Sequence, residues 1–214
     1  MVKEKLELKD KLLDAAEAVV VREGIGNLTL DAVALEAGMS KGGLLHHFRT
    51  KDKLVEAMVT RVAESWREGL LKAYDELPEG RGRTVRAMLN HCLGNAECRT
   101  DQVRRSSSAV FAALAEMRGC PGCPDASPME PMRAVYRDLF QRVAEDGLPK
   151  GVGEAAVAAI DGLWLYWVLG LVPIDDELVD NVRGAVENMI ANSLNDNSSK
   201  VRRSVSKRSR RKRK

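Results

Sequence analysis

The segment from residue 28 to residue 48 constrains this chain more than any other part of its sequence, because it predicts two short helices joined by a glycine turn. Thr29 can cap the first helix, and apolar residues recur at spacings of three and four along it. Gly38 then ends this helix, and Ser40 can cap the second. This layout is typical of a helix-turn-helix motif, whose second helix reads DNA.

The second predicted helix opens on two glycines, Gly42 and Gly43. Glycine is a poor helix former, but it removes a side chain where a helix must approach a phosphate or a base edge closely. Thr50 can cap a further helix whose first turn carries Lys51 and Lys53. Cations at the start of a helix oppose the helix dipole, so they favour a role outside the fold, such as contact with a phosphate backbone.

The same region resembles the N-terminal domain of the TetR family of bacterial transcriptional regulators, from about residue 9 to residue 54. The resemblance rests on an ordered set of motifs: an apolar opening helix followed by Gly24, then Thr29-Leu30, Ala37-Gly-Met-Ser-Lys-Gly-Gly43, His47-Phe48 and Lys51-Asp-Lys-Leu54. Family members usually carry a tyrosine three residues before that phenylalanine. This chain has Leu45 there, which cannot donate a hydrogen bond to a phosphate, and His46 and His47 are the candidates to replace that contact.

We predict that seven residues of this region contact DNA. The two lysines among them are expected to hold phosphates, and the glycines to allow close approach. Because adjacent helical residues point about 100° apart, only one of the two histidines is expected to face the groove, and His46 is preferred over His47. The predicted contacts are Thr29, Ser40, Lys41, Gly42, Gly43, His46 and Lys51.

The remainder of the chain predicts helices and no strand-rich domain. Only 4% of the residues are aromatic, whereas 44% are apolar, which is enough for a sizeable core. We predict an all-α fold with three parts: a three-helix helix-turn-helix domain at 1–54, a helical effector-binding and dimerisation domain at 55–194, and a disordered basic tail at 195–214. Within the second part, Thr84 is expected to cap a helix. The start of the chain lacks an apolar signal segment, so we expect a soluble cytoplasmic protein and no membrane partner.

Charge is divided unevenly along the chain. The formal net charge is +3, but residues 199–214 hold ten Lys and Arg and no acid, which leaves 24 basic against 31 acidic residues in the body. Such a tail is too charged and too poor in apolar residues to pack. The tail either attracts DNA nonspecifically through counterion release or is only a solvated end of the chain.

Two segments near the C-terminus predict a partner surface. Residues 155–172 are apolar on most sides of a helix, and residues 176–194 carry an apolar stripe. Two such helices from each of two subunits close a four-helix bundle, which is how proteins that resemble TetR usually dimerise. The alternative is that both helices pack within one subunit. A two-fold dimer also places two reading helices about 34 Å apart, one turn of DNA, so the homodimer is preferred.

The resemblance further implies a repressor that occludes a promoter at a palindromic operator and is released by an unknown small-molecule effector. Asp161 lies inside an apolar helix beside Trp164, where it can pair with a cationic ligand or form a structural hydrogen bond. Aromatic residues at helical spacing are first of all core, but they can also line a pocket. The candidate pocket residues are Trp66, Phe111, Tyr136, Phe140, Asp161 and Trp164.

Other functions have weaker support in the sequence. Cys120 and Cys123 have the spacing of zinc and redox sites, so a thiol-sensing or metal-sensing regulator is one alternative. We nevertheless expect ordinary reduced cysteines, no metal and no cofactor, because Cys92 and Cys98 cannot face one ion on a helix. A chromosome-binding protein without sequence preference is the second alternative. The chain has no phosphate-binding loop, catalytic triad or paired metal-binding histidines, so an enzyme is not expected and no catalytic residue is assigned.

Overall fold

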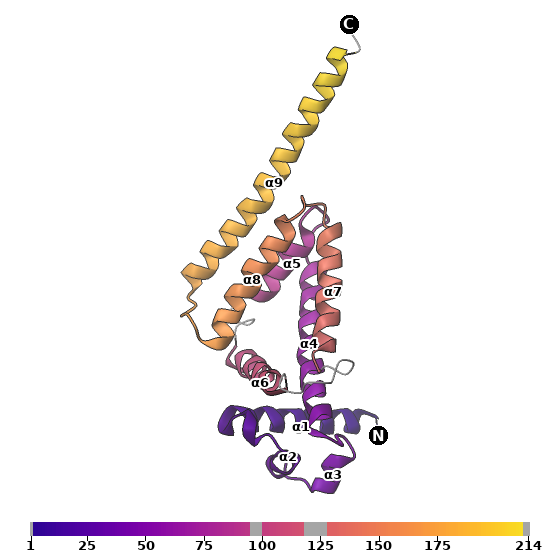
Figure 1. Cartoon of the computed structure of the whole chain (residues 1–214), viewed down its shortest axis with the longest axis vertical. Coiled ribbons are helices and arrows are strands. Elements are labelled where there is room, and N and C mark those ends of the chain that lie inside the picture. The colour runs from indigo at the N-terminus through magenta and orange to yellow at the C-terminus, as the bar shows by residue number, and fades with distance from the viewer. Residues whose placement is uncertain (1, 95–99, 118–127, 212–214) are drawn as a thin grey trace. The chain divides into compact units, whose positions relative to one another are not determined.

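A computed structural model describes residues 2–94, 100–117 and 128–211 of the chain, and this part is helical apart from its turns (Figure 1). The elements are α1 (Val2–Glu23), the 3-10 turn η1 (Ile25–Asn27), α2 (Leu30–Glu36), α3 (Lys41–Leu45), α4 (Lys51–Asp75), α5 (Arg83–Leu93), α6 (Asp101–Met117), α7 (Glu130–Glu145), α8 (Val152–Leu169) and α9 (Asp176–Arg211). They form two compact units, one of residues 1–68 and 99–136 and the other of residues 69–98 and 137–214. The all-α prediction is confirmed.

The first unit is built around α1. This helix packs against α2, η1 and α6, and α2 packs in turn against α3. The core is continuous from the helix-turn-helix region, where Leu28 and Leu44 are fully buried, to Ala109 and Val110 of α6. The unit is therefore larger than the segment 1–54 that was expected to carry the DNA-binding domain, because α6 supplies part of its core.

The turn between α2 and α3 has the predicted caps. The Thr29 hydroxyl accepts a hydrogen bond from the Ala32 amide at 3.1 Å, and the Ser40 hydroxyl accepts one from the Gly43 amide at 3.1 Å. Gly38 takes a φ of 67°, and the next amide, Met39, donates 2.9 Å to the Ala34 carbonyl. A left-handed glycine followed by this bond back to the helix is a Schellman ending, so the helix stops where the sequence indicates. The Thr50 hydroxyl caps α4 in the same way, at 3.2 Å from the Lys53 amide.

A buried carboxylate links three helices of this unit. Glu17 of α1 is only 5% exposed. It pairs with the guanidinium of Arg61 from α4, which also donates 2.7 Å to Asp14, and it accepts a 2.6 Å hydrogen bond from the Ser106 hydroxyl of α6. A buried charge is stable only when it is paired and hydrogen-bonded, so these contacts hold α1, α4 and α6 in one arrangement.

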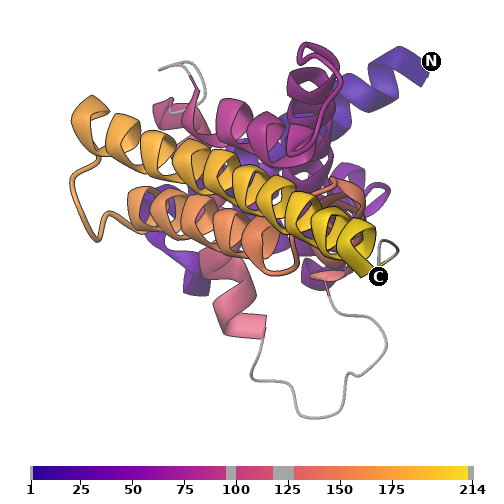
Figure 2. The same ribbon diagram turned by 90° about the horizontal axis from the view of Figure 1, so that it is seen from above.

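The second unit is built around α5, which packs against α8 and α9. Figures 1 and 2 both show α8 and α9 side by side, in orange and yellow. The expectation that Thr84 caps α5 is wrong. The helix begins at Arg83, and the Asp146 carboxylate accepts hydrogen bonds from the first-turn amides of Thr84 and Val85 at 2.9–3.2 Å. A carboxylate from the end of α7 does the capping, because Thr84 lies inside the first turn and is buried.

The C-terminal end of α5 is held by another distant residue. Arg183 of α9 donates 2.6 Å to the Leu93 carbonyl, 3.3 Å to the Leu89 carbonyl and 3.0 Å to the Asn90 side chain. An acid at the first turn and a base at the last turn both oppose the partial charges of the helix ends. Helix α5 is therefore stabilised at both ends by residues more than 50 positions away in sequence.

The two C-terminal helices differ from their expected bounds. Helix α8 spans Val152–Leu169, and α9 continues from Asp176 to Arg211, so the backbone of 195–211 is helical where the sequence analysis expects disorder. Extending an existing helix costs far less than starting one, and Lys and Arg are good helix formers. Helix α8 is also long and apolar enough to span a membrane by length and composition. This is weak evidence for a membrane span, because the core helices of soluble proteins pass the same test.

Candidate nucleic-acid interface

Helix α3 has one outward face and one inward face. Leu44 is fully buried and Phe48, just after the helix, is 4% exposed, whereas Lys41, Gly42, Leu45 and His46 are exposed. The apolar residues anchor the helix in the first unit, so the outward face is available to DNA.

Gly42 and Gly43 differ in their surroundings. A Cβ added at Gly42 would meet no atom within 4 Å, whereas one at Gly43 would lie 3.1 Å from the Met39 methyl group. Packing against Met39 therefore explains why residue 43 is glycine. No such contact explains the glycine at position 42, although glycine costs about 1 kcal/mol relative to alanine within a helix. Close approach by an outside molecule, as predicted from the sequence, remains its best explanation.

Three of the predicted contacts already have partners in the fold. Thr29 and Ser40 use their hydroxyls as caps, as described above. The Lys41 ammonium lies 2.8 Å from Asp31 of α2, with both side chains more than half exposed. An exposed pair of this kind contributes at most about 1 kcal/mol, so Lys41 can exchange Asp31 for a phosphate at little cost.

The remaining two predicted contacts differ in exposure. Lys51 is half-buried, and its ammonium lies 3.5 Å from the Ile25 carbonyl. His46 ends α3 and is exposed, while its neighbour His47 is half-buried. This agrees with the preference for His46, but DNA contact by any of the seven residues stays a prediction.

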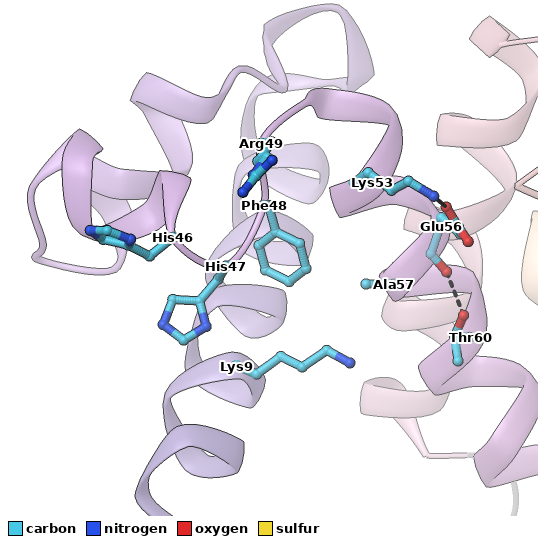
Figure 3. Close-up of a pocket in the computed structure, with 9 residues that line it drawn as sticks. All are labelled: Lys9, His46, His47, Phe48, Arg49, Lys53, Glu56, Ala57 and Thr60. Atoms are coloured by element: carbon cyan, nitrogen blue, oxygen red, sulfur yellow. Dashed lines mark hydrogen bonds and ion pairs between the residues drawn. The ribbon is translucent and has the colours of Figure 1, made fainter.

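A basic hollow of about 470 Å³ opens beside α3 in the first unit. In Figure 3 the Lys9 side chain extends from α1 toward Ala57 of α4. We use the name basic hollow for Lys9, His46, His47, Arg49 and Lys53 together. Its lining side chains are Lys9, His46, His47, Phe48, Arg49, Lys53, Glu56, Ala57 and Thr60. Lys53 already pairs with the one acid there, Glu56, at 2.6 Å. The hollow therefore has an excess of cationic and hydrogen-bond-donating groups, which suits a phosphate.

The sequence analysis named Lys53 as a cation suited to a phosphate backbone but did not include it among the seven predicted contacts, and it did not select Lys9 or Arg49. Lys9 lies about forty positions before the others, so no local spacing indicates that α1 brings it there. Arg49 and Lys53 are cations on either side of the Thr50 cap, and this local charge is the sequence feature that indicates a phosphate contact.

The predicted effector pocket is divided between the two units. In the first, Trp66 and Tyr136 stack with ring centroids 5.9 Å apart, and Phe111 is 37% exposed. In the second, Asp161 and Trp164 are half-buried on α8, and Phe140 is 43% exposed. The role of these six residues in ligand binding stays a prediction.

The cysteine alternative falls mostly outside the described residues. Cys98, Cys120 and Cys123 are all outside them, and Cys92 is a buried cysteine on α5. Within the parts of the chain that the structure describes, no three His, Cys, Asp or Glu side chains gather closely enough to hold a metal ion.

The ring of His91 packs against a glycine of α4. Its ring lies so close to Gly69 of α4 that a Cβ at that position would collide with it. Burial lowers the pKa of His91, because desolvation disfavours the charged imidazolium. His91 is half-buried in the second unit, with its ring packed against α4.

Two family matches cover most of the chain. Residues 12–58 match the bacterial regulatory proteins of the tetR family, and residues 82–191 match the tetracyclin repressor-like C-terminal domain. The HTH-type transcriptional regulator BetI of Escherichia coli O127:H6 is 28% identical over 178 residues, which are 80% of this chain and 88% of the relative. BetI of Shigella flexneri serotype 5b is 27% identical over 177 residues, with the same coverage.

Solved structures share the fold. A regulator from Pseudomonas aeruginosa PAO1 gives a TM-score of 0.64 at 24% identity and covers 86% of this chain and 90% of its own. A regulator from Saccharomonospora viridis in complex with choline gives 0.61 at 19% identity, with 86% and 96% coverage. The multidrug binding protein EbrR complexed with ethidium gives 0.55 at 23% identity, with 86% and 98% coverage.

Proposed function

The chain belongs to the TetR family of bacterial transcriptional regulators, and from this membership we propose that it is a repressor that binds a palindromic operator as a homodimer and is released by a small-molecule effector. As a member of that family it is a DNA-binding regulator of transcription rather than an enzyme, and its place is the cytoplasm. The observation that carries the proposal is the outward face of α3, where an exposed glycine with open space above it lies between exposed Lys41 and His46.

The basic hollow supports a second set of contacts. DNA that lies along the outward face of α3 brings its phosphate backbone past the end of that helix, where Arg49 and Lys53 are exposed. Phosphate contacts position a protein on DNA, whereas base contacts specify the sequence. We therefore assign base reading to α3 and backbone anchoring to the basic hollow.

The proposed dimer uses the outer faces of α8 and α9. One side of α9 is buried through Val179, Val186 and Ile190. The opposite side exposes small residues such as Gly184 and Ala185. On α8 the exposed residues after Glu154 are all apolar: Ala155, Ala158, Ala159, Tyr166 and Leu169. Small residues allow two helices to pack closely, so these faces suit a four-helix bundle with a second copy of the chain.

An organic cation is the effector class that the chain's residues favour. Asp161 and Trp164 lie three positions apart on α8, hence on neighbouring parts of one face, and a carboxylate beside an indole recognises a cation by charge and by the ring face. Two proteins of the same fold were crystallised with organic cations, choline and ethidium. Titration with choline and with ethidium tests this assignment. We expect binding that weakens at least tenfold in Asp161→Asn, whereas equal affinity of both forms would contradict it.

The DNA-binding proposal is tested by selecting genomic fragments at about 150 mM salt, where screening suppresses weak nonspecific attraction. We expect one palindromic motif, recovered both by the full chain and by a chain ending at Asn197. Uniform recovery that disappears with the tail would instead support a chromosome-binding protein without sequence preference.

The role of the basic hollow is tested on the selected operator. Arg49→Gln is expected to reduce the slope of log affinity against log salt by about 1.8, because a dimer loses two phosphate contacts at about 0.9 each. Lys150→Gln, an exposed cation of the second unit, is the matched control and should leave the slope unchanged. An unchanged slope in Arg49→Gln would remove the hollow from the interface.

A further inference from the structure

The outward face of α3 carries one exposed leucine among its few side chains. At about 100° per residue, Leu45 falls about 40° around the helix from Lys41 and about 100° from His46. It is 37% exposed, whereas Leu44, the next residue on the inward side, is fully buried. Leu45 therefore belongs to the same face as the residues that are proposed to read DNA.

Few side chains at the start of α3 can hydrogen-bond to a base edge, since Lys41 is expected to hold a phosphate. The Ser40 hydroxyl caps the helix, Lys41 pairs with Asp31, and Gly42 and Gly43 have no side chains. Farther along the face, Leu45 offers only methyl groups and His46 offers a ring nitrogen. The face is consequently poor in polar groups and has an apolar side chain beside its histidine.

Apolar contact in the major groove distinguishes one base. Thymine presents a C5 methyl group there, whereas the other three bases present only donors and acceptors at their edges. A leucine pressed against a polar base edge would bury that edge without a hydrogen bond, which is unfavourable. Contact with a thymine methyl group has no such cost and removes apolar surface from water.

We propose that Leu45 is a specificity-determining residue that recognises the C5 methyl group of one thymine in each operator half-site. This inference rests on the proposed function, since it requires α3 to lie in the major groove. It also gives a consequence of having leucine where the family usually has tyrosine: a phosphate contact is replaced by a contact that depends on the base.

The experiment uses the operator selected with the full chain. Each thymine is replaced in turn by deoxyuridine, which removes the C5 methyl group and leaves base pairing unchanged. We expect one position in each half-site at which deoxyuridine weakens binding about fourfold, as the loss of one buried methyl contact predicts. In Leu45→Ala the same replacement at that position should have no effect.

Two further variants separate the possible outcomes. Leu35→Ala removes another exposed leucine, 83% exposed on α2, and should keep the wild-type deoxyuridine profile. Leu45→Tyr supplies the hydroxyl that Leu45 lacks, so it should bind the operator without the methyl dependence even if Leu45→Ala binds too weakly to measure. Binding that is indifferent to every deoxyuridine, or a methyl effect that persists in the Leu45 variants, would overturn the inference and leave the proposed function intact. Failure to recover any preferred operator would overturn both.

Discussion

The first unit has a buried polar network between three helices, whereas the second unit has polar caps at the two ends of α5. Glu17 joins α1, α4 and α6 through Arg61 and Ser106. Asp146 and Arg183 instead cap α5 at its first and last turns. A buried network fixes how several helices are oriented, whereas a pair of caps stabilises one helix.

The exposed apolar residues follow the same division. In the described part of the first unit they are scattered, and two of them, Leu35 and Leu45, lie in the helix-turn-helix region. In the second unit one of them, Phe140, lies on α7, and the others gather at and just after the end of α8, at Tyr166, Leu169 and 171–172. Scattered apolar residues are normal on a protein surface, whereas a contiguous group indicates a partner. The difference suits a first unit that faces a charged polymer and a second unit that faces another protein surface.

The largest expected effect comes from Arg61→Ala. This change leaves the buried carboxylate of Glu17 without its cation, and breaking a buried pair destabilises a protein by about 3 kcal/mol. Denaturation at fixed protein concentration measures the free energy of unfolding, and hydrogen exchange locates the loss. We expect α1, α4 and α6 to lose protection.

Arg22→Ala is the control for that change. Arg22 pairs with Glu36 at the surface, where both side chains are exposed to solvent, and its removal should leave the unfolding free energy unchanged within error. If Arg61→Ala behaved like this surface variant, the buried network would not be what holds the first unit together.

A smaller loss is expected from Asp146→Ala. The amides of Thr84 and Val85 lose their acceptor, and removal of a helix cap typically costs about 1 kcal/mol and up to about 2 kcal/mol. Loss of exchange protection should be confined to α5 and the helices packed on it. Asp138→Ala removes an exposed pair with Arg142 on the same helix and should have a smaller effect. Loss of protection in α1 as well would contradict the division into separately stabilised units.

Local signals in the sequence were sufficient for much of this structure. The caps at Thr29, Ser40 and Thr50 and the end of α2 at Gly38 depend on residues within a few positions of each other, and all are confirmed. The cap of α5 was predicted wrongly, because its acceptor, Asp146, lies about sixty positions away in sequence. Lys9 was missed in the basic hollow for the same reason: only the packing of α1 brings it there.

An intermediate effect is expected at Gly69. Its missing side chain makes room for the His91 ring, so Gly69→Ala forces the ring to move and should cost about 1 kcal/mol, the low end for an overpacked interior. The cost should be much smaller in a His91→Ala background. A double-mutant cycle measures this coupling, since residues in contact give non-additive changes. Additive effects would show that the glycine does not serve to place the ring.

The smallest expected effect is a loss of stability in weak acid through His91. Burial lowers the pKa of this group below its ordinary value of 6.5, so the unfolded chain takes up its proton at a higher pH than the folded chain does. Where the unfolded state binds more protons, the free energy of unfolding falls as the pH falls. The contribution of His91 is therefore fully present above about pH 7.5 and decreases as the pH drops through 6.5 toward the folded pKa.

His91→Gln keeps a polar side chain at this position without the titration, so its unfolding free energy should vary less between pH 7.5 and pH 5.5 than that of the wild type. Equal pH dependence in wild type and His91→Gln would mean that folding does not change the pKa of His91, which would contradict the effect of burial on this ring.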